Sequence, residues 1–339
     1  NSGTFYVKVV DTAGNTSSTV SEAKSCGPTI TQISSDGQNF DIIVPINNTT
    51  AVGLNTYSGD ECDKPSRVCR NSYVTGVVIT YQNGTINLGN EQTILSGTYG
   101  SGYNSNTQAV RLTDSRFLVC GNSSSNEGSS VYAYEPTCSI MEVRGNNITR
   151  INSVITEGAS IWEQKGIISL ACDNSASCYM TIDNCTNATG CYENYQISIS
   201  GNSISAWSIS DDNLYSSVKG DPESKANTHW EVHMNYFDDA SYINNGSGGY
   251  ISFAPRNSST YISVNGQHTS EKYRSGVLCR TGTNKFVFVD DDTAYFYQGT
   301  ALIKPITNSI LDNASFNTLV PMGDVCVSIN SKGIAVLKN

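Results

Sequence analysis

Apolar and polar residues alternate in many short segments of this chain. In residues 5–10, Phe5, Val7 and Val9 alternate with more polar side chains. A period of two places successive side chains on opposite faces of a β-strand, with one face toward a core. We therefore expect residues 5–10 to form a strand. We also expect that strand to be paired, because an exposed apolar edge promotes aggregation.

A pair of such segments recurs along the chain. Each pair begins with a short apolar run that follows or starts at Gly, Lys or Arg, and it continues after a polar turn with a run that contains Tyr. The pairs are 116–120 with 131–134, 166–170 with 178–181, 249–253 with 260–264, and 285–289 with 294–297. A last run, 333–337, has no partner after it, as ring closure by the opening strand would require.

Hairpins that repeat at roughly 35 to 50 residues are typical of β-propeller blades. The sequence therefore predicts an all-β protein whose main body, residues 26–339, is propeller-like. Tandem β-sandwiches produce a similar alternation and are the alternative fold. In a propeller, residues 5–10 would close the ring by pairing with residues 334–338.

Composition narrows the choice of partners. Charged residues make up only 15% of the chain, while Asn, Ser, Thr, Gly and Tyr are abundant, and this disfavours helices and suits short strands with polar turns. The formal net charge of −10 argues against a nucleic-acid partner, because phosphate binding needs clustered Lys and Arg. No apolar run approaches the roughly 20 residues that span a bilayer, so no membrane span is expected.

Eleven cysteines are many for so polar a chain. Their spacings do not match zinc modules, and near pairs such as Cys172 and Cys178 suit disulfides in an oxidising, extracellular environment. The pairings that we predict are Cys62–Cys69, Cys120–Cys138, Cys185–Cys191 and Cys279–Cys326. Since the count is odd, one thiol is left over, and Cys26 is the candidate. Eleven Asn-x-Ser/Thr sequons are also compatible with a glycoprotein.

The opening strand and the turn after it resemble a known class of domain. Phe5, Val7 and Val9, followed by Asp11–Asn15, resemble the C-terminal strand and closing turn of bacterial immunoglobulin-like surface domains. The resemblance implies that residues 1–25 are the terminal strand and linker of such a domain, with residues 17–25 as the linker, and that the protein is extracellular. Ring closure by the same strand is the competing interpretation.

A second stretch resembles a propeller motif. Residues 34–40, Ser-Ser-Asp-Gly-Gln-Asn-Phe, resemble the Asp-box turn of sialidase-like β-propellers, in which Asp and Gly cap a hairpin and an aromatic residue packs beneath it. The resemblance implies a carbohydrate-active enzyme as one alternative function. A sialidase-like site needs several Arg residues to grip a carboxylate, and Arg111, Arg116, Arg274 and Arg280 are available. Glycoside hydrolysis also needs paired carboxylates, for which Glu163, Asp183 and Glu231 are candidates.

Two polar clusters are candidate metal sites. Asp290 and Asp292 lie in an Asp-Asp-Asp run that could hold calcium, although the same run suits a solvent-exposed hairpin turn. His229 and His233 bracket Trp230, and on a strand they share one face, but Trp230 occupies the place where a helical zinc-protease motif requires Glu. We therefore expect no catalytic metal at these histidines.

Aromatic residues favour a binding function. Nineteen tyrosines are present, and Tyr or Trp on exposed loops offers stacking area with a polar tip. The candidate binding residues are Trp230, Tyr273, Arg274, Tyr295 and Tyr297. We interpret the chain as a non-catalytic recognition or adhesion protein at a cell surface that binds glycan or protein. The alternatives are a sialidase-like glycoside hydrolase and a structural subunit of a filament or virion.

Overall fold

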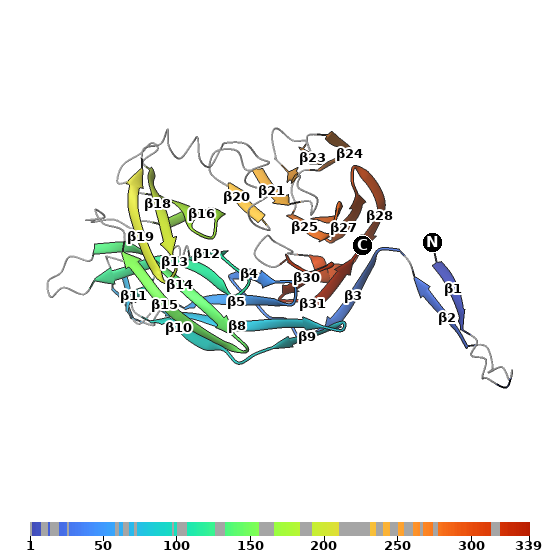
Figure 1. Ribbon diagram of the computed structural model, residues 1–339, viewed down its shortest axis with the longest axis horizontal. Helices are drawn as coiled ribbons and strands as arrows, with labels where there is room; N and C mark the ends of the chain where they lie inside the picture. The colour runs from blue at the N-terminus through green and yellow to red at the C-terminus, as the bar shows by residue number, and fades with distance from the viewer. Residues whose placement is uncertain are drawn as a thin grey trace.

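The computed structural model describes most of the chain at the level of secondary structure (Figure 1). The described residues are 2–7, 13, 20–25, 27–57, 61–63, 68–70, 73–96, 98–99, 107–125, 133–155, 166–183, 192–209, 231–234, 240–244, 250–253, 260–264, 267–273, 277–312 and 319–339. Nearly all of them lie in β-strands joined by turns, and η1 (Ser309–Leu311) is a single 3₁₀ turn. The expected all-β class is confirmed.

Six larger antiparallel sheets follow one another along the described parts of the chain, and we number them sheets 1 to 6. Sheet 1 consists of β4 (Ile42–Asn47), β5 (Thr50–Tyr57), β8 (Tyr73–Gln82), β9 (Thr85–Leu88) and β10 (Gln92–Ser96). Sheet 2 consists of β11 (Thr98–Tyr99), β12 (Gln108–Arg111), β13 (Arg116–Ser125), β14 (Ala133–Arg144) and β15 (Asn147–Ile155). Sheet 3 consists of β16 (Gly166–Asn174), β17 (Ser177–Asp183), β18 (Tyr192–Ser200) and β19 (Ser203–Ile209).

The second half of the chain repeats this arrangement. Sheet 4 consists of β20 (Glu231–Met234), β21 (Ala240–Asn244), β22 (Tyr250–Phe253), β23 (Thr260–Val264) and β24 (Gln267–Tyr273). Sheet 5 consists of β25 (Val277–Gly282), β26 (Lys285–Asp290), β27 (Thr293–Gln298) and β28 (Ala301–Thr307). Sheet 6 consists of β29 (Leu319–Met322), β30 (Val325–Asn330), β31 (Gly333–Lys338) and, from the other end of the chain, β3 (Thr29–Ser34).

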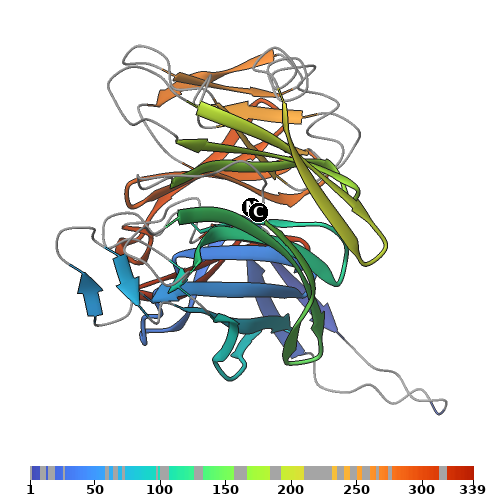
Figure 2. The same cartoon turned by 90° about the vertical axis from the view of Figure 1, so that its left-hand side faces the viewer.

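Each sheet contacts the next, in some cases through several strands, and one set of these contacts follows the order of the chain. The contacts run from β4 to β12, from β12 to β16, from β16 to β20, from β21 to β25 and from β25 to β29. The strand β29 also contacts β4, so the series of contacts returns from sheet 6 to sheet 1. Figure 2 shows sheets 1 and 2, in blue to green, in the lower part of the view and sheet 4, in orange, in the upper part.

Continuous apolar runs form strands that are buried on both faces. Along β26, Phe286 and Phe288 pack into one cluster with Leu278, whereas Val287 and Val289 pack into another with Leu337. Successive side chains point to opposite faces of a strand, so this run has to bury both faces between neighbouring sheets. Leu118 and Val119 of β13 are divided between two clusters in the same way.

The last strand of the chain pairs with β3 and not with the opening strand. β31 takes β30 on one side and β3 on the other, and Thr29 stands opposite Lys338. The interpretation in which residues 5–10 pair with residues 334–338 is therefore wrong. Those residues contribute to β1 (Ser2–Val7), which pairs with β2 (Val20–Ser25), and Figure 1 shows this hairpin apart from the six sheets.

The linker expected at residues 17–25 also needs correction, because residues 20–25 form β2. The register pairs Val7 with Val20 and Ser2 with Ser25. Residues 8–10 lie outside the described part of the chain.

Three disulfides are present in the described part of the chain. Two are the predicted pairs Cys120–Cys138 and Cys279–Cys326, and the third joins the near pair Cys172 and Cys178. Cys120–Cys138 and Cys172–Cys178 each join neighbouring strands within a sheet, whereas Cys279–Cys326 joins β25 of sheet 5 to β30 of sheet 6.

The structure does not test the remaining cysteine predictions, because the side chains concerned are not described. Cys62 stands opposite Cys69 in the register of β6 (Glu61–Asp63) and β7 (Val68–Arg70), but their side chains are not described. Cys26, Cys185 and Cys191 lie outside the described residues.

The turn that resembles an Asp-box connects β3 to β4. Gly37 lies so close to Ser331 that an added Cβ would be 2.0 Å from the Ser331 carbonyl oxygen, and Gln38 donates its backbone N–H to Asn330 O at 3.1 Å. Phe40 is buried, and its ring lies against Gly53, where an added Cβ would come within 2.6 Å of it. The turn thus fastens sheet 6 to sheet 1.

Candidate binding surface

Two of the candidate aromatic residues lie in sheet 5 and are not exposed. Tyr297 is fully buried and stacks on Phe286, with ring centroids 4.9 Å apart. Tyr295 is partly buried and packs against the same cluster. The fully buried Tyr297 ring is therefore not available to a ligand, which corrects the expectation for this residue, whereas the partly buried Tyr295 stays a predicted binding residue.

The side chains of the other candidate binding residues are not described. Tyr273 ends β24, but its side chain is not described, and Trp230 and Arg274 lie outside the described residues. Of the carboxylate candidates, Glu231 and Asp183 lie in β20 and β17, with their side chains not described, and Glu163 lies outside the described part.

Asp290 and Asp292 belong to the tight hairpin between β26 and β27. Asp290 pairs with Thr293, and Asp291 takes the left-handed conformation (φ 50°) that a two-residue turn of this kind requires. Asp292 accepts a hydrogen bond from the Thr293 hydroxyl at 3.0 Å. Among the described residues, no group of three or more His, Cys, Asp or Glu side chains is placed to hold a metal ion. The described residues thus do not bring three such side chains together at the calcium site that the sequence suggests here.

An exposed aromatic pair lies at the end of sheet 1, where the sequence analysis did not expect one. Tyr57 ends β5, Tyr73 begins β8, and the two stand directly opposite each other in the register. Their rings stack with centroids 5.0 Å apart and planes 24° apart. Tyr57 is 38% exposed and Tyr73 is 37% exposed, and few other large hydrophobic side chains of the described residues reach this exposure.

The pair lies where one face of the sheet leaves the core. On β5, Ala51 is buried and Gly53 is covered by the Phe40 ring. Asn55 and Tyr57 continue the same face by the alternation of side chains along a strand. The apolar contact with sheet 6 therefore ends before Tyr57, and the two rings project beyond it.

The Glu91 carboxylate is hydrogen-bonded at the edge of this pair. Glu91 lies in the short segment between β9 and β10, which both pair with β8. Its Oε1 atom accepts hydrogen bonds from the Tyr57 hydroxyl at 3.1 Å and from the Thr75 hydroxyl at 2.7 Å. Partial burial raises the pKa of Tyr57, and the hydrogen bond and negative charge of Glu91 raise it further. The Tyr57 hydroxyl is thus kept protonated as a donor.

Neighbouring contacts hold the end of β5 in place. The Asp41 carboxylate accepts the Thr56 backbone N–H at 2.7 Å, and the Asp41 backbone N–H donates to Asn55 Oδ1 at 3.2 Å. On the opposite face, the Thr56 hydroxyl donates to the hydroxyl of buried Thr107 at 3.0 Å. The position of Tyr57 is therefore fixed before any ligand arrives, which lowers the entropic cost of binding.

We define the Tyr57–Tyr73 surface as Tyr57, Tyr73, Thr75 and Glu91. Its only signal in the sequence is that Tyr57 and Tyr73 bracket the polar insertion with Cys62 and Cys69. Sheet register places the two rings opposite each other and brings Glu91 beside Tyr57. The sequence pattern does not predict that register.

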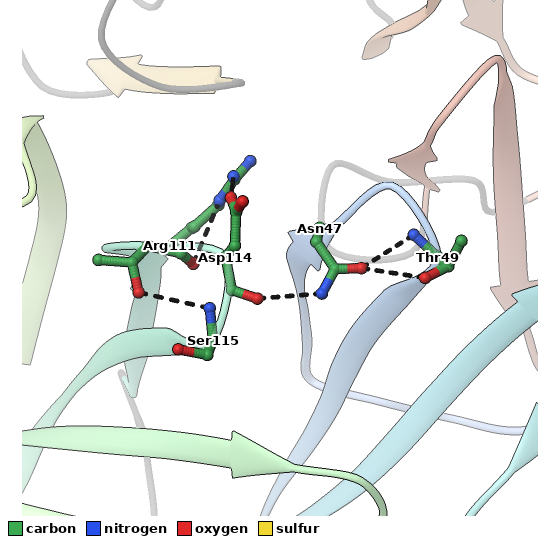
Figure 3. A network of polar contacts seen from close by, with 6 residues as sticks. Asn47, Thr49, Arg111, Asp114 and Ser115 are labelled. Atoms are coloured by element: carbon green, nitrogen blue, oxygen red, sulfur yellow. Dashed lines mark hydrogen bonds and ion pairs between the residues drawn. The ribbon is translucent and has the colours of Figure 1, made fainter.

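Two of the arginines proposed for a sialidase-like site, Arg111 and Arg116, are engaged in structural contacts, and Arg274 lies outside the described residues. Arg111 forms an ion pair with Asp114, whose backbone carbonyl accepts a hydrogen bond from Asn47 Nδ2 at 3.0 Å (Figure 3). Asn47 Oδ1 in turn accepts the Thr49 backbone N–H at 3.0 Å. This network ties the β4–β5 turn to the β12–β13 turn, so it fastens sheet 1 to sheet 2.

Arg116 has a similar role between sheets 2 and 3. It pairs with Glu142 at 3.2 Å and donates to the Gly201 carbonyl at 2.9 Å, and Arg144 pairs with Glu142 at 2.7 Å. Burial alone would raise the pKa of Glu142, but the hydrogen bonds from Arg116 and Arg144 outweigh it and hold this pKa below its usual range.

Comparison with known proteins gives weak similarities. No family model and no curated protein matches the chain. Among solved structures, a glycosyl hydrolase from Bacteroides ovatus is similar with a TM-score of 0.33 and 9% identity, over 97% of this chain and 88% of that one. Prolyl oligopeptidase B from Galerina marginata is similar with a TM-score of 0.30 and 8% identity, over 78% of this chain. The match spans about a third (34%) of the peptidase. Neither likeness is close enough to bear on function.

Proposed function

We propose that this protein is a non-catalytic recognition module that binds glycans through the Tyr57–Tyr73 surface, carried on a six-bladed β-propeller. The observation that carries the binding function is the stacked pair of exposed rings with Glu91 at its edge. A sugar ring offers an apolar C–H face and a rim of hydroxyls. The tyrosine rings suit that face, and the carboxylate suits the hydroxyls.

Three observations support the propeller. The sheets are antiparallel and of similar size, and each sheet contacts the next one along the chain. The series of contacts returns from β29 to β4. Sheet 6 combines strands from both parts of the chain, which is how a propeller ring is held closed. Tandem sandwiches would not need the contact between β29 and β4.

The disulfides favour an oxidising environment, as in secreted and surface proteins. In the described residues, no helix is long and apolar enough to cross a membrane. Recognition of a glycan at a cell surface, with adhesion as its outcome, is consistent with this environment.

The test is a glycan array probed with the wild-type protein and four variants. Y57A, Y73A and the double variant remove the platform, whereas W207A is the matched control, because Trp207 is 44% exposed but lies on β19 of sheet 3. We expect the wild type and W207A to bind the same oligosaccharides and the double variant to lose at least tenfold in affinity.

Loss of binding in W207A with retention in the double variant would contradict the proposal. Release of reducing sugar from a bound oligosaccharide would contradict the non-catalytic part and favour the glycoside hydrolase alternative.

A further inference from the structure

The Tyr57–Tyr73 surface carries a fixed negative charge, and this bears on which sugars fit it. Glu91 is exposed and is held beside the two rings by its hydrogen bonds to Tyr57 and Thr75. We propose that Glu91 restricts the surface to glycans without negative charge, and that it accepts hydrogen bonds from hydroxyl or ammonium groups of the bound sugar. This inference rests on the proposed function.

The acceptor capacity of Glu91 is only partly used. An ionised carboxylate offers about four lone-pair positions on its two oxygens. Tyr57 and Thr75 both donate to Oε1, and within the described residues no group donates to Oε2. An acceptor that is fixed at the edge of an aromatic platform can receive a hydroxyl of a sugar stacked on the rings, and it receives an ammonium group more strongly because the hydrogen bond is then charge-assisted.

A second carboxylate lies close by and adds to the negative potential. Asp41 accepts the backbone N–H of Thr56, the residue before Tyr57. Among the described residues, neither Asp41 nor Glu91 forms an ion pair with Lys or Arg. A uronate, sialate or sulfate bound on the rings would meet this potential without a compensating Lys or Arg among the described side chains, so like-charge repulsion disfavours it.

Three trisaccharides with the same β-1,4-linked glucose backbone test the inference. Cellotriose is neutral, its glucosamine analogue is cationic, and its glucuronic acid analogue is anionic. We expect wild-type affinity to rank cationic over neutral over anionic, with the neutral and anionic sugars separated by about tenfold at low salt. Glu91→Gln keeps the shape and an acceptor oxygen, so it should reduce that separation several-fold while cellotriose still binds.

Salt dependence of the wild type provides a measurement that needs no variant. The difference between the neutral and anionic sugars should shrink in 0.5 M salt, where the screening length is about 4–5 Å. Equal affinity for the neutral and anionic sugars, unchanged in E91Q and by salt, would overturn the inference but leave the glycan-binding function intact. Binding of none of the three sugars, or binding that survives Y57A/Y73A, would overturn the proposed function and the inference with it.

Discussion

Cys279 of β25 and Cys326 of β30 form a disulfide that joins sheet 5 to sheet 6, at a sequence separation of 47 residues. Cys172 and Cys178 are bridged within sheet 3 with a separation of only 6 residues, and all four cysteines are buried. A cross-link that closes a longer loop removes more conformational entropy from the unfolded chain.

Replacing both cysteines of each pair by Ala should therefore give different losses of stability. The loop-entropy relation gives about 4 kcal/mol for Cys279–Cys326 and about 2 kcal/mol for Cys172–Cys178. Urea unfolding of the two double variants measures the difference. A loss in C172A/C178A equal to or above that in C279A/C326A would contradict the expected order.

The pairing of β3 with β31 makes a prediction for two truncations. Removal of residues 1–27 deletes the β1–β2 hairpin and leaves β3 intact, so the main unfolding transition should keep its midpoint. Removal of residues 1–34 also deletes β3, with its ladder to β31 and the contacts of Ile30 and Ile33 with the core. We expect this to cost about 3 kcal/mol or more. Equal midpoints for the two truncations would show that β3 does not stabilise sheet 6.

Gly37 should tolerate no side chain. An added Cβ would lie 2.0 Å from the Ser331 carbonyl oxygen, a backbone atom that moves only if sheet 6 shifts. Gly37→Ala should therefore destabilise the protein by about 1–3 kcal/mol. Gly27→Ala is the matched control, because nothing lies within 4 Å of the added atom, and it should change stability by less than about 0.5 kcal/mol. Equal thermal unfolding midpoints for Gly37→Ala and Gly27→Ala would argue against the close approach of Gly37 to Ser331.

Glu142 links stability to pH. Its pKa in the folded protein is lowered, so its contribution is fully present above the unfolded value of about 4.3 and is lost as pH falls through the folded value. Glu142→Gln should accordingly destabilise the protein at pH 7, and the difference from the wild type should shrink at pH 3. Asp312→Asn, in an exposed pair with Lys332, should have little effect at either pH. A pH-independent effect of E142Q would show that packing and not charge is responsible.

The strands of the core could be predicted because their signal is local. The run 285–289 corresponds to β26 and the run 294–297 to β27, since a continuous apolar run, a polar turn and a second run define a hairpin wherever it lies. The turn at Asp290–Asp292 was open to two interpretations, because three adjacent carboxylates suit either a calcium loop or an exposed hairpin. The backbone conformation of Asp291 establishes the hairpin turn, and three His, Cys, Asp or Glu side chains of the described residues are not grouped there to hold a metal ion.

The binding surface could not be predicted, because it depends on contacts between distant segments. Tyr297 and Tyr57 both lie near strand ends and are each followed by a polar residue in the sequence, yet Tyr297 is buried and stacks on Phe286 while Tyr57 extends beyond the core. Glu91 reaches Tyr57 across β8 only because β9 and β10 both pair with that strand. Sequence periodicity predicts which side chains share one face of a strand. It does not predict how much of that face a neighbouring sheet covers.

The location of the bound sugar on Tyr57 and Tyr73 is the central claim, and NMR of the tyrosine rings tests it most directly. In protein labelled at the tyrosine rings, with signals assigned by Y57F and Y73F, cellotriose should shift the resonances of these two rings at concentrations near the dissociation constant. The buried ring of Tyr297 should not shift, because it lies in the core of sheet 5. Saturable binding of cellotriose without a shift at Tyr57 or Tyr73 would contradict the account.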